Sequence, residues 1–224
     1  MSLANRHVIE SALHAETARR VAAEFRLKVL HSQFDPHTLF NTLSTLSALI
    51  ASDPAAADTM LMHLVACLRG STSCQASPSH TLADEFTRIN HYLAILQVRM
   101  ADRLQCELYL PDELADVRLP AMLLQPLVEN AITHGLETKI EGGTLSVSAE
   151  LEEGFVVITV RDTGLGIKPK PRDESTQVPT GLALVAERLA SRYGASASCR
   201  VVAAEDSAGG TTAIVRFPAM GPAR

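Results

Sequence analysis

The stretch LHSQFDPHTLFNTL, residues 30–43, contains a histidine that could act as a nucleophile. Apolar residues recur around it every three or four positions, which predicts a helix that buries one stripe. Pro36 removes a backbone amide and should kink this helix just ahead of His37. Asn41 follows His37 by four residues and therefore lies on the same face. A neutral imidazole can accept a phosphoryl group while a neighbouring amide orients a water or a carboxylate. The alternative is an ordinary histidine on a helix surface.

A second polar set occurs in LLQPLVENAITHGL, residues 123–136. Its apolar residues can face a sheet, while Glu129, Asn130 and His134 lie on or beside the polar face of the predicted helix. The amide oxygen of Asn130 could coordinate a hard cation such as Mg²⁺, and the Glu129 carboxylate could act as a base or orient a ligating water. A capped amphipathic helix that ends at Gly135 would explain the same residues equally well.

The segment VRDTGLGI, residues 160–167, places a carboxylate and two glycines directly after a predicted strand. Asp162 would be fixed at the strand end, and Gly164 and Gly166 would let the backbone approach a flat ligand closely. A carboxylate that accepts a hydrogen bond from an exocyclic amine would select adenine over guanine. Asp162 is therefore a candidate adenine-reading residue.

Thr180, Gly181 and Leu182 open another predicted helix, whose free amides and positive dipole end suit a phosphate group. The polar, proline-rich segment 168–179 has no apolar face, which is typical of a mobile lid. Residues 209–212, GGTT, lie between the last two predicted strands and could be just a hairpin turn. The phosphate group of a ligand would thus lie at the start of the helix that Thr180 opens.

The elements that position these residues form two predicted domains, 1–103 and 104–224. The first is helical, with helices over 1–51 and 55–69, a loop over 70–79, and a third helix that begins near Thr81. Asp53 and Pro54 are typical of a helix start, and Thr81 with Asp84 resembles a capping box. A helix as long as 1–51 cannot bury its stripe against itself, so a partner helix or a second subunit is implied. Three arginines of the third helix are interpreted as a solvated face: Arg88, Arg99 and Arg103.

From about residue 104 the periodicity changes to an α+β pattern. The first predicted strand covers 106–110 and ends at Pro111. The elements predicted after it are a helix near 121–136, strands near 143–151 and 155–161, a helix near 181–193, and strands near 196–203 and 211–217. This alternation indicates a second domain with its own sheet and core.

Composition and motif searches exclude several classes of protein. The chain of 224 residues is long enough for one large or two small domains. A formal net charge of −5 and no dense Lys/Arg run argue against nucleic-acid binding. No run of eighteen apolar residues is present, so no membrane span is expected within these residues. Four scattered cysteines and a charged N-terminal segment without a signal core predict reduced thiols in a cytoplasmic protein. The sequence contains no P-loop, dinucleotide fingerprint, eukaryotic kinase set, G-x-S-x-G or H-E-x-x-H motif.

The segments VENAITHG, RDTGLGI, TGLALVAERL and GGTTAIVRF, in this order, resemble the N, G1, G2 and terminal glycine boxes of the Bergerat-fold (GHKL) ATPases. With SQFDPHTLFNTLS and LADEFTRINHYLAILQVRMADRL upstream, the chain resembles the LytS-type sensor histidine kinases over about residues 25–217. This resemblance implies an α + α/β fold, in which an N-terminal helical dimerisation hairpin or bundle precedes an α/β sandwich of the GHKL type. It also implies that the sandwich binds ATP and Mg²⁺.

The same resemblance implies roles for individual residues. His37 would be the phosphoacceptor, Asn130 the magnesium ligand, Glu129 the base and Asp162 the adenine reader, while three glycines would form the nucleotide loops: Gly164, Gly166 and Gly181. The implied partners are a second copy of the chain and a response regulator, whose aspartate would accept the phosphoryl group. The chain would be cytoplasmic, and it would reach a membrane only through a sensor region that these residues do not include.

Four positions depart from the family pattern. Asp35 replaces the usual Asn before the proline, and Thr38 replaces the Phe after the histidine. In the second glycine box, Pro179 replaces the first Gly and Leu184 stands where Asn is expected. Pro179 has no amide to donate to a phosphate. The alternative function is therefore a catalytically weak, dimeric signalling module or a response-regulator phosphatase that keeps the kinase fold. A GHKL ATPase without a histidine substrate is a third possibility.

Overall fold

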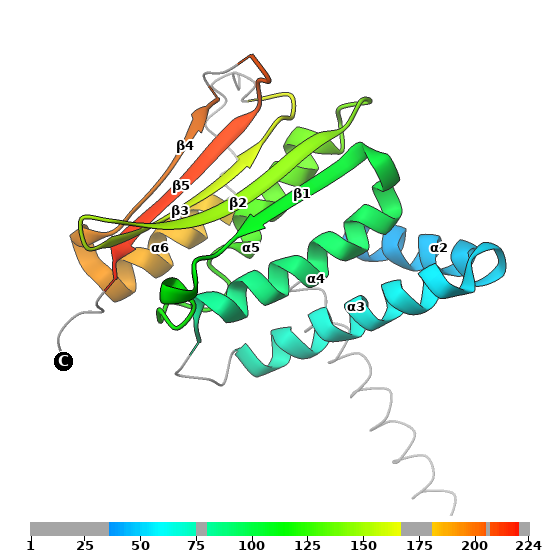
Figure 1. Ribbon diagram of the computed structural model, residues 1–224, viewed down its shortest axis with the longest axis horizontal. Helices are drawn as coiled ribbons and strands as arrows, with labels where there is room; N and C mark the ends of the chain where they lie inside the picture. Colours follow the sequence, from blue (N-terminus) through cyan, green and yellow to red (C-terminus); the bar gives the residue numbers. More distant parts are fainter. Residues whose placement is uncertain (1–35, 75–79, 167–180, 205–206, 220–224) are drawn as a thin grey trace, which may run out of the picture. The chain divides into compact units, whose positions relative to one another are not determined.

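The structure is a computed structural model that describes residues 36–74, 80–166, 181–204 and 207–219 (Figure 1). For residues 36–39 and 68–74 it describes the backbone alone. The chain divides after Ser52 into two compact units. In the first unit, helix α2 (Pro36–Ser52) confirms the last third of the long helix predicted over 1–51. The description of α2 starts at Pro36, so the kink predicted just ahead of His37 lies outside the described residues.

The second unit begins with a pair of helices, α3 (Pro54–Cys74) and α4 (Leu82–Met100). The predicted start of α3 is confirmed, because the Asp53 carboxylate accepts a hydrogen bond from the amide of Ala56 at 3.0 Å. The loop predicted from Gly70 is wrong over residues 70–74, which continue the helix. Gly, Ser and Thr disfavour a helix by only about 1 kcal/mol or less each, so they do not end one as a proline would.

The predicted capping box at the start of α4 is confirmed. The Thr81 hydroxyl accepts a hydrogen bond from the amide of Asp84 at 3.2 Å, and the Asp84 carboxylate accepts one from the amide of Thr81 at 2.9 Å. Helix α4 packs against α3 and also against the first strand, β1 (Leu104–Tyr109), and the helix α5 (Gln125–Asn130) (Figure 1). Its buried apolar side chains therefore pack on more than one side of the helix: Phe86, Ile89, Tyr92, Leu93, Ile95 and Leu96.

The interpretation of the α4 arginines as a solvated face is wrong for two of the three. Arg88 is buried and forms an ion pair with Glu85 at 3.1 Å. Arg99 is 12% exposed and forms an ion pair with Glu137, while Arg103, in the short helix η1 (Ala101–Arg103), is exposed. Because α4 is covered on more than one side, fewer of its positions face water than a simple amphipathic pattern predicts.

The sheet has five strands in the order β1-β2-β3-β5-β4. They are β1 (Leu104–Tyr109), β2 (Gly143–Glu152), β3 (Phe155–Asp162), β4 (Ser198–Ala203) and β5 (Thr211–Pro218). β1 pairs with β2 in parallel, and all other pairs are antiparallel. Alternate residues of β2, β3 and β5 are buried, as expected for strands with one face on a core.

The helices that contact this sheet lie on one face of it, and α3 packs on α4 instead (Figure 1). The helix predicted near 121–136 begins only at α5 (Gln125–Asn130) and continues as a π-helical segment, η3 (Ala131–Leu136). α6 (Gly181–Tyr193) is followed by η4 (Gly194–Ser196), and η2 (Asp112–Leu114) follows β1. The α + α/β fold class predicted from the sequence is confirmed: helices are followed by a mixed five-stranded sheet with helices on it. Within the described ranges, no helix is both long and apolar enough to cross a bilayer.

Candidate functional site

Asp162 lies at the end of β3 and is 2% exposed. Its Oδ1 accepts a hydrogen bond from the amide of Gly164 at 2.8 Å. Burial raises the pKa of Asp162 above its ordinary value, although hydrogen bonds from Gly164 and Thr211 and the charge of Arg161 act in the opposite direction. A carboxylate that has lost this much water gains strongly from any further donor that reaches it.

Three glycines that are far apart in the sequence surround Asp162 so closely that side chains would not fit. A Cβ at Gly135 would lie 2.6 Å from Asp162 Oδ1, and one at Gly164 would lie 2.3 Å from the carbonyl carbon of Gly135. Gly210 has a φ of +96°, and a Cβ there would lie 1.9 Å from the carbonyl oxygen of Asp162. The GGTT segment is therefore more than a hairpin turn, because it packs against the candidate adenine reader. We call Gly135, Gly164 and Gly210 the glycine cradle.

Gly210→Ala is expected to destabilise the protein by about 3 kcal/mol or more, because the new methyl group would collide with rigid backbone. Gly154→Ala is the matched control, since Gly154 also has a positive φ, +82°, but no atom would lie within 4 Å of its Cβ. The control should lose only about 1 kcal/mol from the left-handed backbone. Urea unfolding of both variants measures the difference. Equal losses in the two variants would show that Gly210 is not packed against Asp162.

Glu129 and Asn130 are the last two residues of α5, and both are half-buried. Gln125 Nε2 donates a hydrogen bond to Glu129 Oε1 at 2.8 Å, which fixes the orientation of that carboxylate. Asn130 directly precedes the π-helical segment η3, and π-helical turns are frequent at functional sites. His134 lies on η3 and is exposed. The end of α5 thus presents an amide and an oriented carboxylate side by side.

The start of α6 lies next to α5. A Cβ at Gly181 would lie 3.0 Å from the Cβ of Pro126, so the first turn of α6 packs on the first turn of α5. Leu182 is half-buried in the same turn. Gly166 ends the described part of the loop after β3, and Thr180 lies outside the described residues. The structure therefore brings α5 and α6 together as the predicted site requires.

Sequence reasoning missed two residues of this region. Gln125 precedes Glu129 by one helical turn, so its spacing could have identified it as a partner of that carboxylate. Lys139 Nζ donates to the carbonyl oxygen of Thr163 at 2.6 Å, which ties the segment after η3 to the loop after β3. No local pattern could have indicated that second contact, because it joins segments 24 residues apart.

The other candidate residues, His37 and Asn41, belong to the first unit. Both lie on α2, four residues apart, and for His37 the structure describes the backbone alone. The carbonyl of Asn41 accepts a hydrogen bond from the Thr45 hydroxyl at 3.0 Å. Of the candidate residues, then, the described structure collects those on α5, β3 and α6 in the second unit, whereas the histidine and its neighbour are held on a separate helix.

Two family models match the chain in succession. Residues 25–104 match the family described as "Histidine kinase". Residues 115–221 match the family described as "Histidine kinase-, DNA gyrase B-, and HSP90-like ATPase". The first range includes α2, α3 and α4, and the second includes the glycine cradle and the end of α5.

Several curated relatives are similar over most of the chain. Sensor histidine kinase BtsS of Escherichia coli (strain K12) is 33% identical over 86% of this chain, and YpdA of the same strain is 36% identical over 80%. Sensor protein LytS of Oceanobacillus iheyensis is 30% identical over 82%. The chain spans about a third of the length of these relatives, 33% in each case.

One similar solved structure is the histidine kinase domain of the Erythrobacter litoralis EL346 blue-light activated histidine kinase. It is 14% identical, the match covers 86% of this chain and 92% of that one, and the TM-score is 0.48.

Proposed function

We propose that this chain, which belongs to the sensor histidine kinases of the LytS type, is the phosphotransfer core of such a kinase. In this proposal the second unit binds ATP with Mg²⁺, the γ-phosphoryl group passes to His37, and an aspartate of a response regulator then accepts it. The observation that carries the proposal is the buried carboxylate of Asp162 inside the glycine cradle. A flat base with an exocyclic amine suits such a carboxylate, because the amine would add a charge-assisted hydrogen bond to those from Gly164 and Thr211.

The residues at the end of α5 fit a magnesium nucleotide. Mg²⁺ prefers oxygen ligands and keeps several of its waters, so one amide oxygen and one nearby carboxylate are enough protein ligands. Asn130 supplies the amide oxygen and Glu129 the carboxylate, which Gln125 already orients. Asn130 would hold the metal, and Glu129 would hold a ligating water or a proton. The bound ion would supply positive charge that stabilises the transferring phosphoryl group.

The proposed reaction is an in-line displacement. A ring nitrogen of His37 forms a bond to the γ-phosphorus while the bond between that phosphorus and the β–γ bridging oxygen breaks, which releases ADP. Glu129 would take the imidazole proton, and Asn41, one turn from His37 on α2, would orient the phosphorylated ring or the incoming aspartate. Amides at Gly181 and Leu182, with Thr180, would bind phosphate oxygens. His134, which is exposed on η3, would add a polar contact to the nucleotide.

The proposal also includes the partners and the location of the protein. A second copy of the chain would cover the apolar side chains that α2 exposes, of which Phe40 is 65% and Ile50 64% exposed. The response regulator would bind where phosphorylated His37 is accessible. The chain would act in the cytoplasm, as part of a longer sensor that resembles its relatives in length.

The test is incubation of the purified chain with γ-labelled ATP and Mg²⁺. The chain should take up label that is acid-labile and alkali-stable, as a phosphoramidate requires. EDTA should reduce this label to background, and a response-regulator receiver domain should remove it. Acid-stable label, or label that persists in EDTA, would contradict the proposal. A folded dimer that neither binds ATP nor takes up label would instead favour the interaction module or the phosphatase.

A further inference from the structure

The turn just before α5 has a strained backbone. Met122 has a φ of +58°, and among the described residues only two other non-glycine residues have a positive φ, Ala101 and Glu153. A side chain in this region of φ is disfavoured, so the surrounding contacts must hold it there. The turn leads directly into α5, which ends at Glu129 and Asn130. Whatever holds Met122 therefore also fixes where α5 begins.

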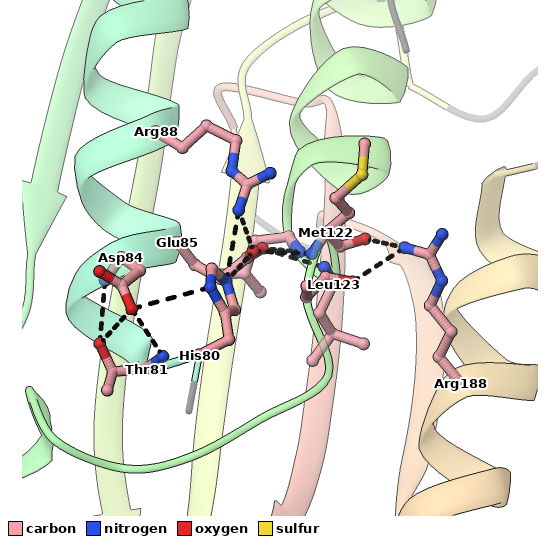
Figure 2. Close-up of polar contacts among 10 residues, drawn as sticks. His80, Thr81, Asp84, Glu85, Arg88, Met122, Leu123 and Arg188 are labelled. Carbon is pink, nitrogen blue, oxygen red and sulfur yellow. Dashed lines mark hydrogen bonds and ion pairs between the residues drawn. The ribbon is translucent and has the colours of Figure 1, made fainter. Parts of the chain in front are cut away.

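Helix α4 holds the amide side of this turn through Glu85, which is fully buried (Figure 2). Glu85 Oε1 accepts a hydrogen bond from the amide of Met122 at 2.8 Å, and Oε2 accepts from the amides of Leu123 and Leu124, each at 2.9 Å. His80 Nε2 lies 2.6 Å from Oε1. One carboxylate thus binds three consecutive amides ahead of α5.

Glu85 is held in its charged form by its neighbours. Burial alone would raise the pKa of Glu85, but the hydrogen bond from His80, the charge of Arg88 and the amide of Leu124 outweigh it, so the pKa lies below its ordinary value. Arg88 Nη2 lies 3.1 Å from Oε1 (Figure 2). The three amides therefore meet a full negative charge, which makes these hydrogen bonds stronger than neutral ones.

Helix α6 holds the carbonyl side of the same turn through Arg188 (Figure 2). Arg188 Nη1 donates to the carbonyl oxygens of Ala121 at 3.1 Å and Met122 at 2.5 Å. α6 begins at Gly181, in the predicted phosphate-binding segment, and its first turn packs on Pro126 of α5. The turn is thus held between a carboxylate from α4 and a guanidinium from α6, and we call this arrangement the Met122 clamp.

The far end of the α5–η3 segment is also held from the end of α4. Arg103 donates to the carbonyl oxygens of Lys139 at 2.8 Å and Ile140 at 2.9 Å, and Arg99 forms an ion pair with Glu137. Glu85 lies in the first turn of α4, and Arg99 lies in its last turn. One straight helix therefore contacts the segments on both sides of the one that carries Asn130.

We infer that Arg188 and Glu85 are positioning residues, which set the location of α5 through the Met122 clamp and so place Asn130 and Glu129 for the metal-bound phosphates. This inference rests on the proposed function. Asp162 is on β3 and has no contact with the clamp among the contacts described, so recognition of the base should be independent of it. The clamp should therefore control the magnesium-dependent part of nucleotide binding and leave the metal-free part unchanged.

The test compares Arg188→Ala with Arg192→Ala, a matched arginine one turn further along α6. Arg192 lies over the ring of Tyr193, and the hydrogen bonds from α6 to the turn come from Arg188. Binding of a fluorescent ATP analogue is measured in EDTA and in Mg²⁺, together with the labelling rate at saturating ATP. For Arg188→Ala, the increase in affinity on adding Mg²⁺ should be smaller by about 10-fold or more, and so should the labelling rate at saturating ATP. Losses of this size are usual when a residue that orients a metal ligand is removed. Affinity in EDTA should stay within about 2-fold, as should every value for Arg192→Ala.

Glu85→Gln is the second variant, because glutamine keeps the shape but has one acceptor oxygen for three amides. If it folds, it should reproduce the pattern of Arg188→Ala. Equal values for Arg188→Ala and Arg192→Ala would overturn the inference and leave the proposed function intact. Equal loss of affinity in EDTA and in Mg²⁺ would also overturn it, because it would indicate general damage.

A wild-type chain that binds no nucleotide would instead refute the proposed function. Hydrogen exchange of the backbone amides at 123–131, measured without nucleotide, then tests whether the Met122 clamp orders α5. Faster exchange in Arg188→Ala than in Arg192→Ala would support the clamp as the device that orders α5. Equal exchange would overturn it.

Discussion

His37→Gln is expected to remove all acid-labile label from the chain, a loss of at least about 1000-fold, because an amide nitrogen cannot attack the γ-phosphorus. Glutamine is similar to histidine in size and polarity, so α2 should remain helical. The measurement is label per chain after separation in alkaline conditions. Circular dichroism and dimer mass serve as the controls for folding.

Nucleotide binding provides the second control for this variant. All proposed nucleotide-binding residues belong to the second unit, so His37→Gln should bind ATP with wild-type affinity. Undiminished label on His37→Gln would mean that another histidine, or a different residue type, accepts the phosphoryl group. Loss of both label and ATP binding would mean that the substitution damaged the fold, and a milder replacement such as His37→Asn would then be compared.

Asn130→Ala is expected to lower the labelling rate at saturating ATP by about 100-fold or more, because it removes the oxygen proposed to hold the metal. Affinity for ATP in EDTA should change by less than about 3-fold, since Asp162 and the glycine cradle are untouched. Glu141→Gln is the control, because Glu141 is exposed in the turn after η3. A rate for Asn130→Ala equal to that of the control would remove Asn130 from the site.

The two variants can also be combined to show the direction of transfer. Asn130→Ala keeps its histidine and His37→Gln keeps its nucleotide site. When the two are exchanged into mixed dimers, label should reappear on the Asn130→Ala subunit if transfer runs from one subunit to the other. Transfer within one subunit predicts no recovery.

Features with a local signal could be predicted from the sequence. The box formed by Thr81 and Asp84 lies within one turn, and the alternation of residues 155–161 is typical of a half-buried strand, so both elements were expected at nearly the observed positions. The Asp53 cap of α3 could be predicted for the same reason, because Asp53 and the amide that it binds are three residues apart. The fold class follows because each such element was identified with its correct type.

Features that depend on distant parts of the chain could not be predicted. Arg88 has the spacing of a surface residue on α4, but α4 packs on several neighbours, and Arg88 is buried beside Glu85. Gly135 and Asp162 are separated by 27 positions in the sequence, and no periodicity indicates that they touch. The late start of α5 has the same cause, because the Met122 turn exists only through contacts from α4 and α6.

The predicted domain boundary at residues 103/104 stays a prediction. The packing of α4 nevertheless affects where this chain can be joined to a segment of another protein. A splice at 104 would separate β1 from the helix that packs on it and would leave an edge strand with an uncovered apolar side. A splice after Ser52 would keep α3, α4 and the sheet on one inherited fragment. Chimeras in which the residues before the junction come from another protein should therefore stay soluble and regulated when the junction follows Ser52. They should lose both properties when the junction is at residue 104.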